Sequence, residues 1–178
     1  MQNKYGKSKY NYFTENWTKV QKVSRTKEGL FAHHKFEDHA VLLAKPEFAK
    51  HNPFEWQHAE NLVYCDYLEH LLLHILICEY PSPEQNLSES VGIGGAVNFL
   101  IPELNDFYSG MPISLAWKQN CFNKVKEDVD CYITLVKRLI KNSSNYPGFS
   151  LQRIKSSANE NLGIWSANKN KKLTSQFC

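Results

Sequence analysis

The chain has 178 residues, of which 42% are hydrophobic and 22% are charged. This length and composition predict one folded domain, or a small core with extensions, and exclude a chain that is disordered throughout. No apolar run is long enough to span a bilayer, and the Lys-rich start lacks the apolar region of a signal peptide. Together with five irregularly spaced cysteines, this predicts a cytoplasmic protein that does not enter a membrane.

The net charge of +3 is distributed unevenly. Residues 1–30 carry seven basic and two acidic side chains, and residues 137–178 carry eight and one, so the middle of the chain is acidic. Basic ends around an acidic centre are expected where both termini contact phosphates beside a site that holds a cation. Solvated basic tails are the alternative interpretation.

Residues 1–28 are interpreted as a basic N-terminal arm. Its lysines alternate with tyrosines up to Tyr12, a combination suited to contacts with phosphates and stacking on bases. Trp17, Val20 and Val23 then recur at helical spacing, which is compatible with a short amphipathic helix or an extended arm.

Residues 29–79 form the predicted core and contain all seven histidines. The segments Gly29–Phe36 and Asn61–Cys65 are short and rich in aromatic or β-branched residues, so we expect two strands joined by a long surface connection with one or two helical turns. His33 and His34 are neighbours in the first strand. They should point to opposite faces of the strand and cannot share one role.

A helix is predicted from Tyr67 to about Glu79. Asp66 and Glu69 have the spacing of a capping box at its start, and the prolines that follow Tyr80 end it. Histidines 70 and 74 would lie on one face of this helix and could converge on a single ion. Taken alone, such a pair is more often a buried structural feature.

Residues 80–141 are predicted to form a helical region that covers the core. Gly92–Ala96 is interpreted as a tight helix start, since no strand precedes it and no Lys-Ser or Lys-Thr pair follows, as a phosphate-binding loop would require. A mostly apolar helix, interrupted at Pro102, should continue to Tyr108. A single long amphipathic helix is predicted over Ile113–Lys141.

The order of His33-His34, Asn61 at the second strand and His70-x-x-x-His74 on a helix resembles the ββα-metal finger of the HNH nucleases, in the form found in colicin DNase domains. The resemblance implies an α+β fold in which this finger, a β-hairpin plus a helix, is embedded among additional α-helices. It also implies that His33, His70 and His74 bind one divalent metal ion, that His34 is the general base, and that Asn61 braces the loop carrying the base.

The chemistry of phosphodiester hydrolysis agrees with these roles. A divalent ion held by neutral imidazoles acts as a Lewis acid, and a histidine with a pKa of about 6.5 can take a proton from water at neutral pH. We therefore expect a metal-dependent DNA endonuclease of restriction, phage or mobile-element type, with Mg²⁺, Mn²⁺, Zn²⁺ or Ni²⁺ as cofactor. The alternatives are a nuclease that cuts RNA and a non-catalytic, zinc-stabilised module that binds nucleic acid or protein.

The sequence departs from the family pattern in two respects. It has no Cys-x-x-Cys pair, and Phe31 stands where the colicin-type domains have a glutamate two places before the histidine pair. The arginine that stabilises the transition state in the colicin-type domains would have to come from another part of this chain.

Residues 142–178 are interpreted as a basic C-terminal segment, either a DNA-reading arm or partly ordered coil. The predicted contacts with DNA, double-stranded in the first instance, are Arg25, Lys35, Arg153 and Lys155. A homodimer is expected if both strands of a symmetric site are cut, because one finger offers one hydrolytic centre.

Overall fold

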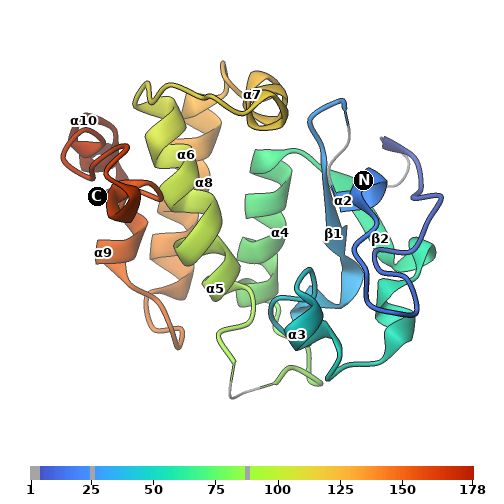
Figure 1. Ribbon diagram of the computed structural model, residues 1–178. Helices are drawn as coiled ribbons and strands as arrows, with labels where there is room; N and C mark the ends of the chain where they lie inside the picture. Colours follow the sequence, from blue (N-terminus) through green and yellow to red (C-terminus); the bar gives the residue numbers. More distant parts are fainter. Residues whose placement is uncertain (1–4, 25–26, 87–88) are drawn as a thin grey trace.

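The computed structural model of the protein describes residues 5–24, 27–86 and 89–178. Figure 1 shows a mixed α+β structure in which one small antiparallel sheet is accompanied by many helices. No helix within the described ranges is long and apolar enough to cross a membrane. Arg25, one of the predicted DNA contacts, lies outside the described residues.

The sheet consists of β1 (Phe31–His34) and β2 (Leu62–Cys65), which pair antiparallel with His33 opposite Val63. Both predicted strands are therefore confirmed. The first is shorter than predicted because residues 35–38 turn into a 3-10 helix. Further 3-10 turns and the one-turn helix α3 (Pro46–Ala49) occupy the long connection between the strands, as expected.

Helix α4 (Tyr67–Glu79) follows β2 directly and has the predicted bounds. The Asp66 side chain accepts hydrogen bonds from the backbone N–H groups of Leu68 and Glu69, at 3.0 and 2.9 Å. The Glu69 carboxylate accepts a bond from the Asp66 N–H at 3.0 Å, which completes the capping box. This cap fixes where the helix starts, and with it the direction in which each histidine of α4 points.

The helical region after α4 begins with α5 (Ile93–Gly95), a π-helical turn (Ala96–Leu100) and α6 (Ile101–Tyr108), which run on without a break. The tight helix start predicted here is confirmed. Pro102 has no N–H to offer the carbonyl group of Asn98, and its ring crowds that carbonyl. The π turn ends two residues before the proline, and widening of the hydrogen-bond pattern there relieves this conflict.

The single long helix predicted over Ile113–Lys141 is wrong. The structure has two helices there, α7 (Ala116–Asn123) and α8 (Val129–Ser143). In the turn between them Val125 is buried, and its carbonyl oxygen accepts a 2.6 Å hydrogen bond from the Tyr108 hydroxyl. Apolar spacing continues through the turn because a buried residue lies in it, so periodicity alone did not reveal the break. As predicted, α8 packs against α4.

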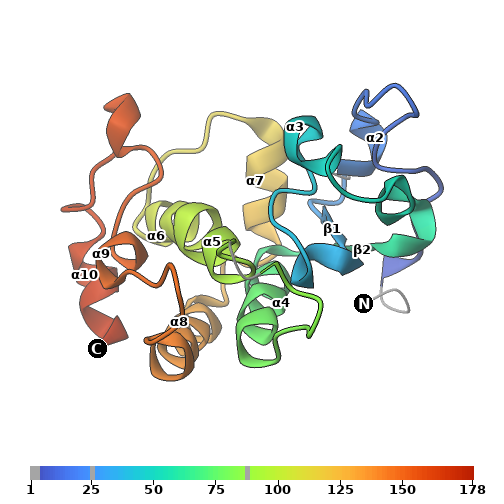
Figure 2. The ribbon, with the colours of Figure 1, turned by 90° about the horizontal axis from the view of Figure 1, so that it is seen from below.

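The C-terminal segment contains two one-turn helices, α9 (Leu151–Ile154) and α10 (Lys171–Thr174), at the end of the molecule that lies opposite the hairpin in Figure 2. Ile154, Leu173 and Phe177 are buried in the main hydrophobic core. This packing argues against a coil or a free arm.

The described part of the N-terminal segment, residues 5–24, includes the one-turn helix α2 (Gln21–Ser24) and packs against the hairpin. Tyr12 and Phe13 are buried with Ala32 and Leu62 in a second, smaller core. The segment predicted as a basic arm therefore also provides one wall of the fold.

Candidate metal centre

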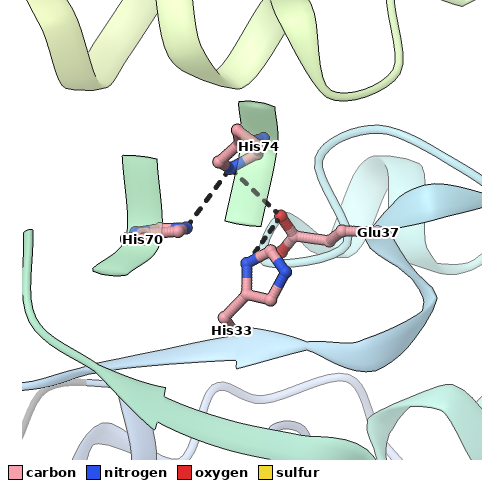
Figure 3. A group of neighbouring side chains, drawn as sticks. All are labelled: His33, Glu37, His70 and His74. Carbon is pink, nitrogen blue, oxygen red and sulfur yellow. Dashed lines mark hydrogen bonds and ion pairs between the residues drawn. The ribbon is translucent and has the colours of Figure 1, made fainter. Parts of the chain in front are cut away.

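Four side chains from three elements converge between β1 and α4, as Figure 3 shows. His33 comes from β1, Glu37 from the 3-10 turn that follows it, and His70 and His74 from one face of α4. Each offers one ligand atom, and these atoms all lie within 4.8 Å of one another. The three histidines predicted as metal ligands are thus brought together, and with Glu37 they form a group, hereafter the metal centre, that could hold a metal ion.

Three separations within the metal centre fit one small cation. The two Nε2 atoms of His70 and His74 are 3.3 Å apart, and Glu37 Oε2 is 3.6 Å from His74 Nε2 and 3.3 Å from His33 Nδ1. Tetrahedral ligands with metal–ligand bonds of about 2.0–2.2 Å are roughly 3.3–3.6 Å apart. The side chains therefore need little movement to bind an ion of the size of Zn²⁺.

The orientation of His74 is fixed by a backbone carbonyl group. Its Nδ1 lies 3.0 Å from the Gly92 carbonyl oxygen, which can only accept, so Nδ1 carries the proton. In the neutral ring Nε2 then points a lone pair at the Glu37 carboxylate. His33 Nδ1, also beside this carboxylate, is buried and has no hydrogen-bond partner among the described residues. A nitrogen lone pair that faces a carboxylate, as at His74, is relieved by a cation between the two groups.

Burial sets the charge of the metal centre. It lowers the pKa of His33 to about 4 and also lowers the pKa values of His70 and His74, so all three rings are neutral at pH 7. Burial alone would raise the pKa of Glu37. The neighbouring imidazoles, His33 first among them, outweigh this effect and hold the pKa of Glu37 well below its usual range. Three neutral imidazoles and one carboxylate form a donor set suited to a divalent transition metal.

These pKa values predict that the metal-free protein loses stability as the pH falls from about 6.5 to about 4. In this interval the unfolded chain binds more protons than the folded chain, because the pKa of His33 is about 4 in the folded protein. The loss from this residue is roughly 3 kcal/mol when complete. The lowered pKa of Glu37 also reduces stability as the pH falls below the ordinary pKa of a glutamate.

Urea unfolding in EDTA at several pH values measures this loss of stability, and a His33→Gln variant should show a weaker pH dependence. A free energy of unfolding that does not change between pH 7 and pH 5 would contradict it.

His34, the predicted general base, is not one of the four side chains of the metal centre but contacts it through Glu37. Its ring is completely buried and lies 4.5 Å from the ring of Tyr12, centroid to centroid. One ring nitrogen is 2.9 Å from Gln57 Oε1, and the other is 3.3 Å from Glu37 Oε1. The prediction that the two neighbouring histidines face opposite sides of the strand is confirmed. Complete burial does not suit a residue that must reach an incoming water molecule.

The prediction that the second strand begins at Asn61 is wrong by one residue, because Asn61 ends the 3-10 turn Ala59–Asn61 and β2 begins at Leu62. The Asn61 side-chain amide donates a 2.8 Å hydrogen bond to the carbonyl oxygen of Glu55, which closes the turn that carries Gln57. Gln57 is the residue that contacts His34, so Asn61 supports the histidine pair indirectly.

Glu37 is the member of the metal centre that sequence reasoning missed. The colicin-type pattern has a glutamate before the histidine pair, where Phe31 stands in this chain, whereas the structure places one three residues after the pair. The available signal was the His33-x-x-x-Glu37 spacing. This spacing has meaning only if the chain turns helically at the end of β1, and nothing in the sequence pattern indicates a 3-10 turn there.

One wall of a pocket of about 690 Å³ is formed by Glu37, His70 and His74. Lys19 and Arg153 also line this pocket, and the Arg153 guanidinium donates a hydrogen bond to the Asn98 side chain. Of the predicted DNA contacts among the described residues, Arg153 therefore faces the same space as the metal centre. The other two, Lys35 and Lys155, do not line the pocket.

The segment that carries α5 closes the metal centre on the side of His74. A Cβ atom at Gly95 would lie only 2.2 Å from Cε1 of His74 and 2.6 Å from its Nδ1. Gly95 has ordinary helical dihedral angles, so the absence of a side chain serves packing and not backbone conformation. At Gly94 the nearest atom, Cβ of Ser90, would be 3.5 Å away, an ordinary contact.

Gly95→Ala is therefore expected to displace the His74 ring and to weaken metal binding by about 10–100-fold. Gly94→Ala, one residue earlier in the same helix, should leave metal affinity unchanged. Competition with a chromophoric chelator measures both affinities, and the visible spectrum of the Co²⁺ form reports the coordination geometry. Equal affinities for the two variants would show that Gly95 does not position His74.

A comparison of the chain with protein-family models, curated proteins and solved structures found no significant match. The geometry and chemistry of the metal centre are therefore the basis on which a function can be proposed.

Proposed function

We propose that the protein is a metal-dependent phosphodiester hydrolase of the HNH type that cuts DNA. The observation that carries the proposal is the position of the metal centre: three histidines, one from a strand and two from the following helix, meet a carboxylate at the wall of a 690 Å³ pocket. Structural metal sites are usually closed, whereas catalytic sites keep access for substrate. The order of the elements, strand, strand and capped helix, also agrees with the resemblance to the ββα-metal finger.

His33, His70 and His74 would hold the ion through ring nitrogens. Nitrogen donors favour Zn²⁺ or Ni²⁺, and Mn²⁺ and Mg²⁺ are the further candidates. When bound, a divalent ion supplies Lewis acidity to the phosphate and to the leaving oxygen.

Glu37 is proposed as the proton acceptor in place of His34. Its Oε2 faces the metal centre, while His34 lies 3.3 Å from its Oε1. Glu37 Oε2 would take the proton from the attacking water, and His34, itself in contact with Gln57, would keep the carboxylate in place. His34 is then a positioning residue, which agrees with its complete burial.

Arg153 and Lys19 are proposed to balance the negative charge that develops on the phosphate. Both line the pocket that the metal centre faces, and neither belongs to the ββα unit. Fixed cations directed at developing charge lower the barrier of such reactions.

The proposal is tested with protein that has been stripped of metal by a chelator. Supercoiled plasmid and the small substrate bis(p-nitrophenyl) phosphate are incubated with the protein and one divalent ion at a time. Nicking or linearisation of the plasmid, and release of p-nitrophenol, are expected with at least one ion, and sequencing of the DNA ends reports any preferred site. Tight metal binding without hydrolysis of either substrate would overturn the proposal.

A second function is favoured by one observation. Three of the distances between the four donors match a tetrahedral site, and all four donors lie within 4.8 Å of one another, so all four could bind a single zinc ion and leave no open position. The protein would then be a zinc-stabilised binding module, and removal of the metal would unfold it.

A further inference from the structure

A second depression lies on the surface outside the metal centre. Its volume is about 480 Å³, and it shares no lining residue with the pocket beside the metal centre. We name it the basic depression after the residues that line it: Tyr5, Lys7, Lys9, Tyr10, Lys22, Glu28, Leu30, Tyr64 and Lys124. Four lysines and three tyrosines surround it, with one carboxylate.

The lysines of the basic depression come from segments far apart in the sequence. Lys7 and Lys9 precede the hairpin, Lys22 belongs to α2, and Lys124 directly follows α7. No run of basic residues in the sequence predicts this grouping of all four, because it depends on how α7 packs beside the start of β1. All four side chains are exposed.

The walls of the basic depression are held by contacts with the rest of the fold. The Tyr5 hydroxyl lies 3.4 Å from Asp66, the residue that caps α4. The Asn120 side chain of α7 donates a 3.3 Å hydrogen bond to the carbonyl oxygen of Lys27, just before β1. A Cβ atom at Gly29 would lie 2.3 Å from the Asn120 carbonyl oxygen, so α7 approaches this segment closely. The lysines are therefore presented together by a fixed surface.

The chemistry of this surface suits a polynucleotide. Exposed ammonium groups bind phosphates and release counterions, and exposed aromatic rings stack on bases that are not paired. Tyr10 is 54% exposed, so its ring is available for stacking. An acidic peptide would use the lysines, but its carboxylate side chains offer no ring on which Tyr10 could stack.

We propose that the basic depression binds the backbone of a single-stranded DNA segment, with Tyr10 stacked on one of its bases. The inference rests on the proposed function, which makes DNA the substrate. It adds a site outside the metal centre that would hold an unpaired strand while the scissile phosphate lies in the other pocket.

The test uses the full chain and a fluorescein-labelled oligothymidylate of 20 nucleotides, with fluorescence anisotropy measured over a range of NaCl concentrations. A Lys9→Gln/Lys124→Gln variant is expected to bind at least about tenfold more weakly at low salt, and its salt dependence of log K should be shallower by about 1.4, roughly 0.7 for each lost phosphate contact. The matched control, Lys137→Gln/Lys172→Gln, removes two exposed lysines outside the basic depression and should bind like the wild type. Tyr10→Ala should lose about tenfold in affinity, and Tyr10→Phe should not.

Equal losses in the Lys9/Lys124 variant and its control would overturn the inference, because binding would then depend on overall charge alone. Competition by polyglutamate as effective as competition by the oligonucleotide would also overturn it and would indicate an acidic protein partner. Hydrolysis of bis(p-nitrophenyl) phosphate separates the two proposals, since this small substrate needs only the metal centre and should be hydrolysed normally by the Lys9/Lys124 variant. The wild type could bind the oligonucleotide through these lysines without hydrolysing plasmid or bis(p-nitrophenyl) phosphate. The proposed function would then be wrong, whereas the assignment of the basic depression as a DNA-binding site would be supported.

Discussion

Glu37→Gln is expected to lower the rate of metal-dependent phosphodiester hydrolysis by about 10²–10⁴-fold, while Zn²⁺ affinity stays within about tenfold of the wild type. The substitution keeps the size of the side chain and its contact with His34, but the amide cannot accept a proton from water. The three histidines remain to hold the ion. Initial rates with bis(p-nitrophenyl) phosphate, and Zn²⁺ affinity by competition with a chromophoric chelator, measure the two effects separately.

Two further variants serve as comparisons for Glu37→Gln. His74→Ala should lose both hydrolysis and metal affinity, the latter by at least about 100-fold, because it removes a ring that the Gly92 carbonyl group orients toward the metal centre. His58→Ala removes a histidine outside the metal centre, 3.7 Å from Glu60, and should retain both properties. If Glu37→Gln loses as much metal affinity as His74→Ala, Glu37 is a fourth ligand. The closed, structural centre would then be the better description of this protein.

The part of the metal centre that sequence reasoning could predict is the part set by local rules. Asp66 and Glu69 fix the first residue of α4, and once that residue is known the four-residue spacing places His70 and His74 on one face. Strand alternation likewise separates His33 from His34. These relations depend on a few neighbouring residues.

The parts that could not be predicted depend on long-range packing. The break at Val125 is held by the Tyr108 hydroxyl, which comes from another helix. The fit of Gly95 against His74 requires α5 to pack against α4 at the level of the His74 ring. Glu37 joins the metal centre because the chain turns immediately after β1. His34 loses access to solvent because Tyr12, from the segment predicted as an N-terminal arm, packs over its ring. None of these contacts leaves a periodic signal in the sequence.

The same dependence on long-range packing applies to Asp106, whose loss should cost several kcal/mol of stability. This carboxylate is completely buried on α6, and it accepts hydrogen bonds from four groups of the C-terminal segment. The donors are Ser157 Oγ at 2.9 Å, the Ala158 N–H at 3.1 Å, Asn159 Nδ2 at 2.7 Å and Asn170 Nδ2 at 2.7 Å. The segment after α9 is thus tied to α6 by four hydrogen bonds to one side chain. Helix α9 itself carries Arg153 to the pocket beside the metal centre.

Asp106→Ala is expected to lower the free energy of unfolding by about 3–5 kcal/mol, because it leaves one buried donor, on Asn170, and three partly buried donors without an acceptor. Asp130→Ala is the matched control: it removes an exposed carboxylate from the first turn of α8 and should cost only about 0.5 kcal/mol. Urea unfolding gives both values, and limited proteolysis should cut the Asp106 variant first within residues 155–170. A loss below about 1 kcal/mol would contradict this prediction. The C-terminal segment would then be held chiefly by its buried apolar residues, Ile154, Leu173 and Phe177, and the hydrogen bonds to Asp106 would contribute little stability.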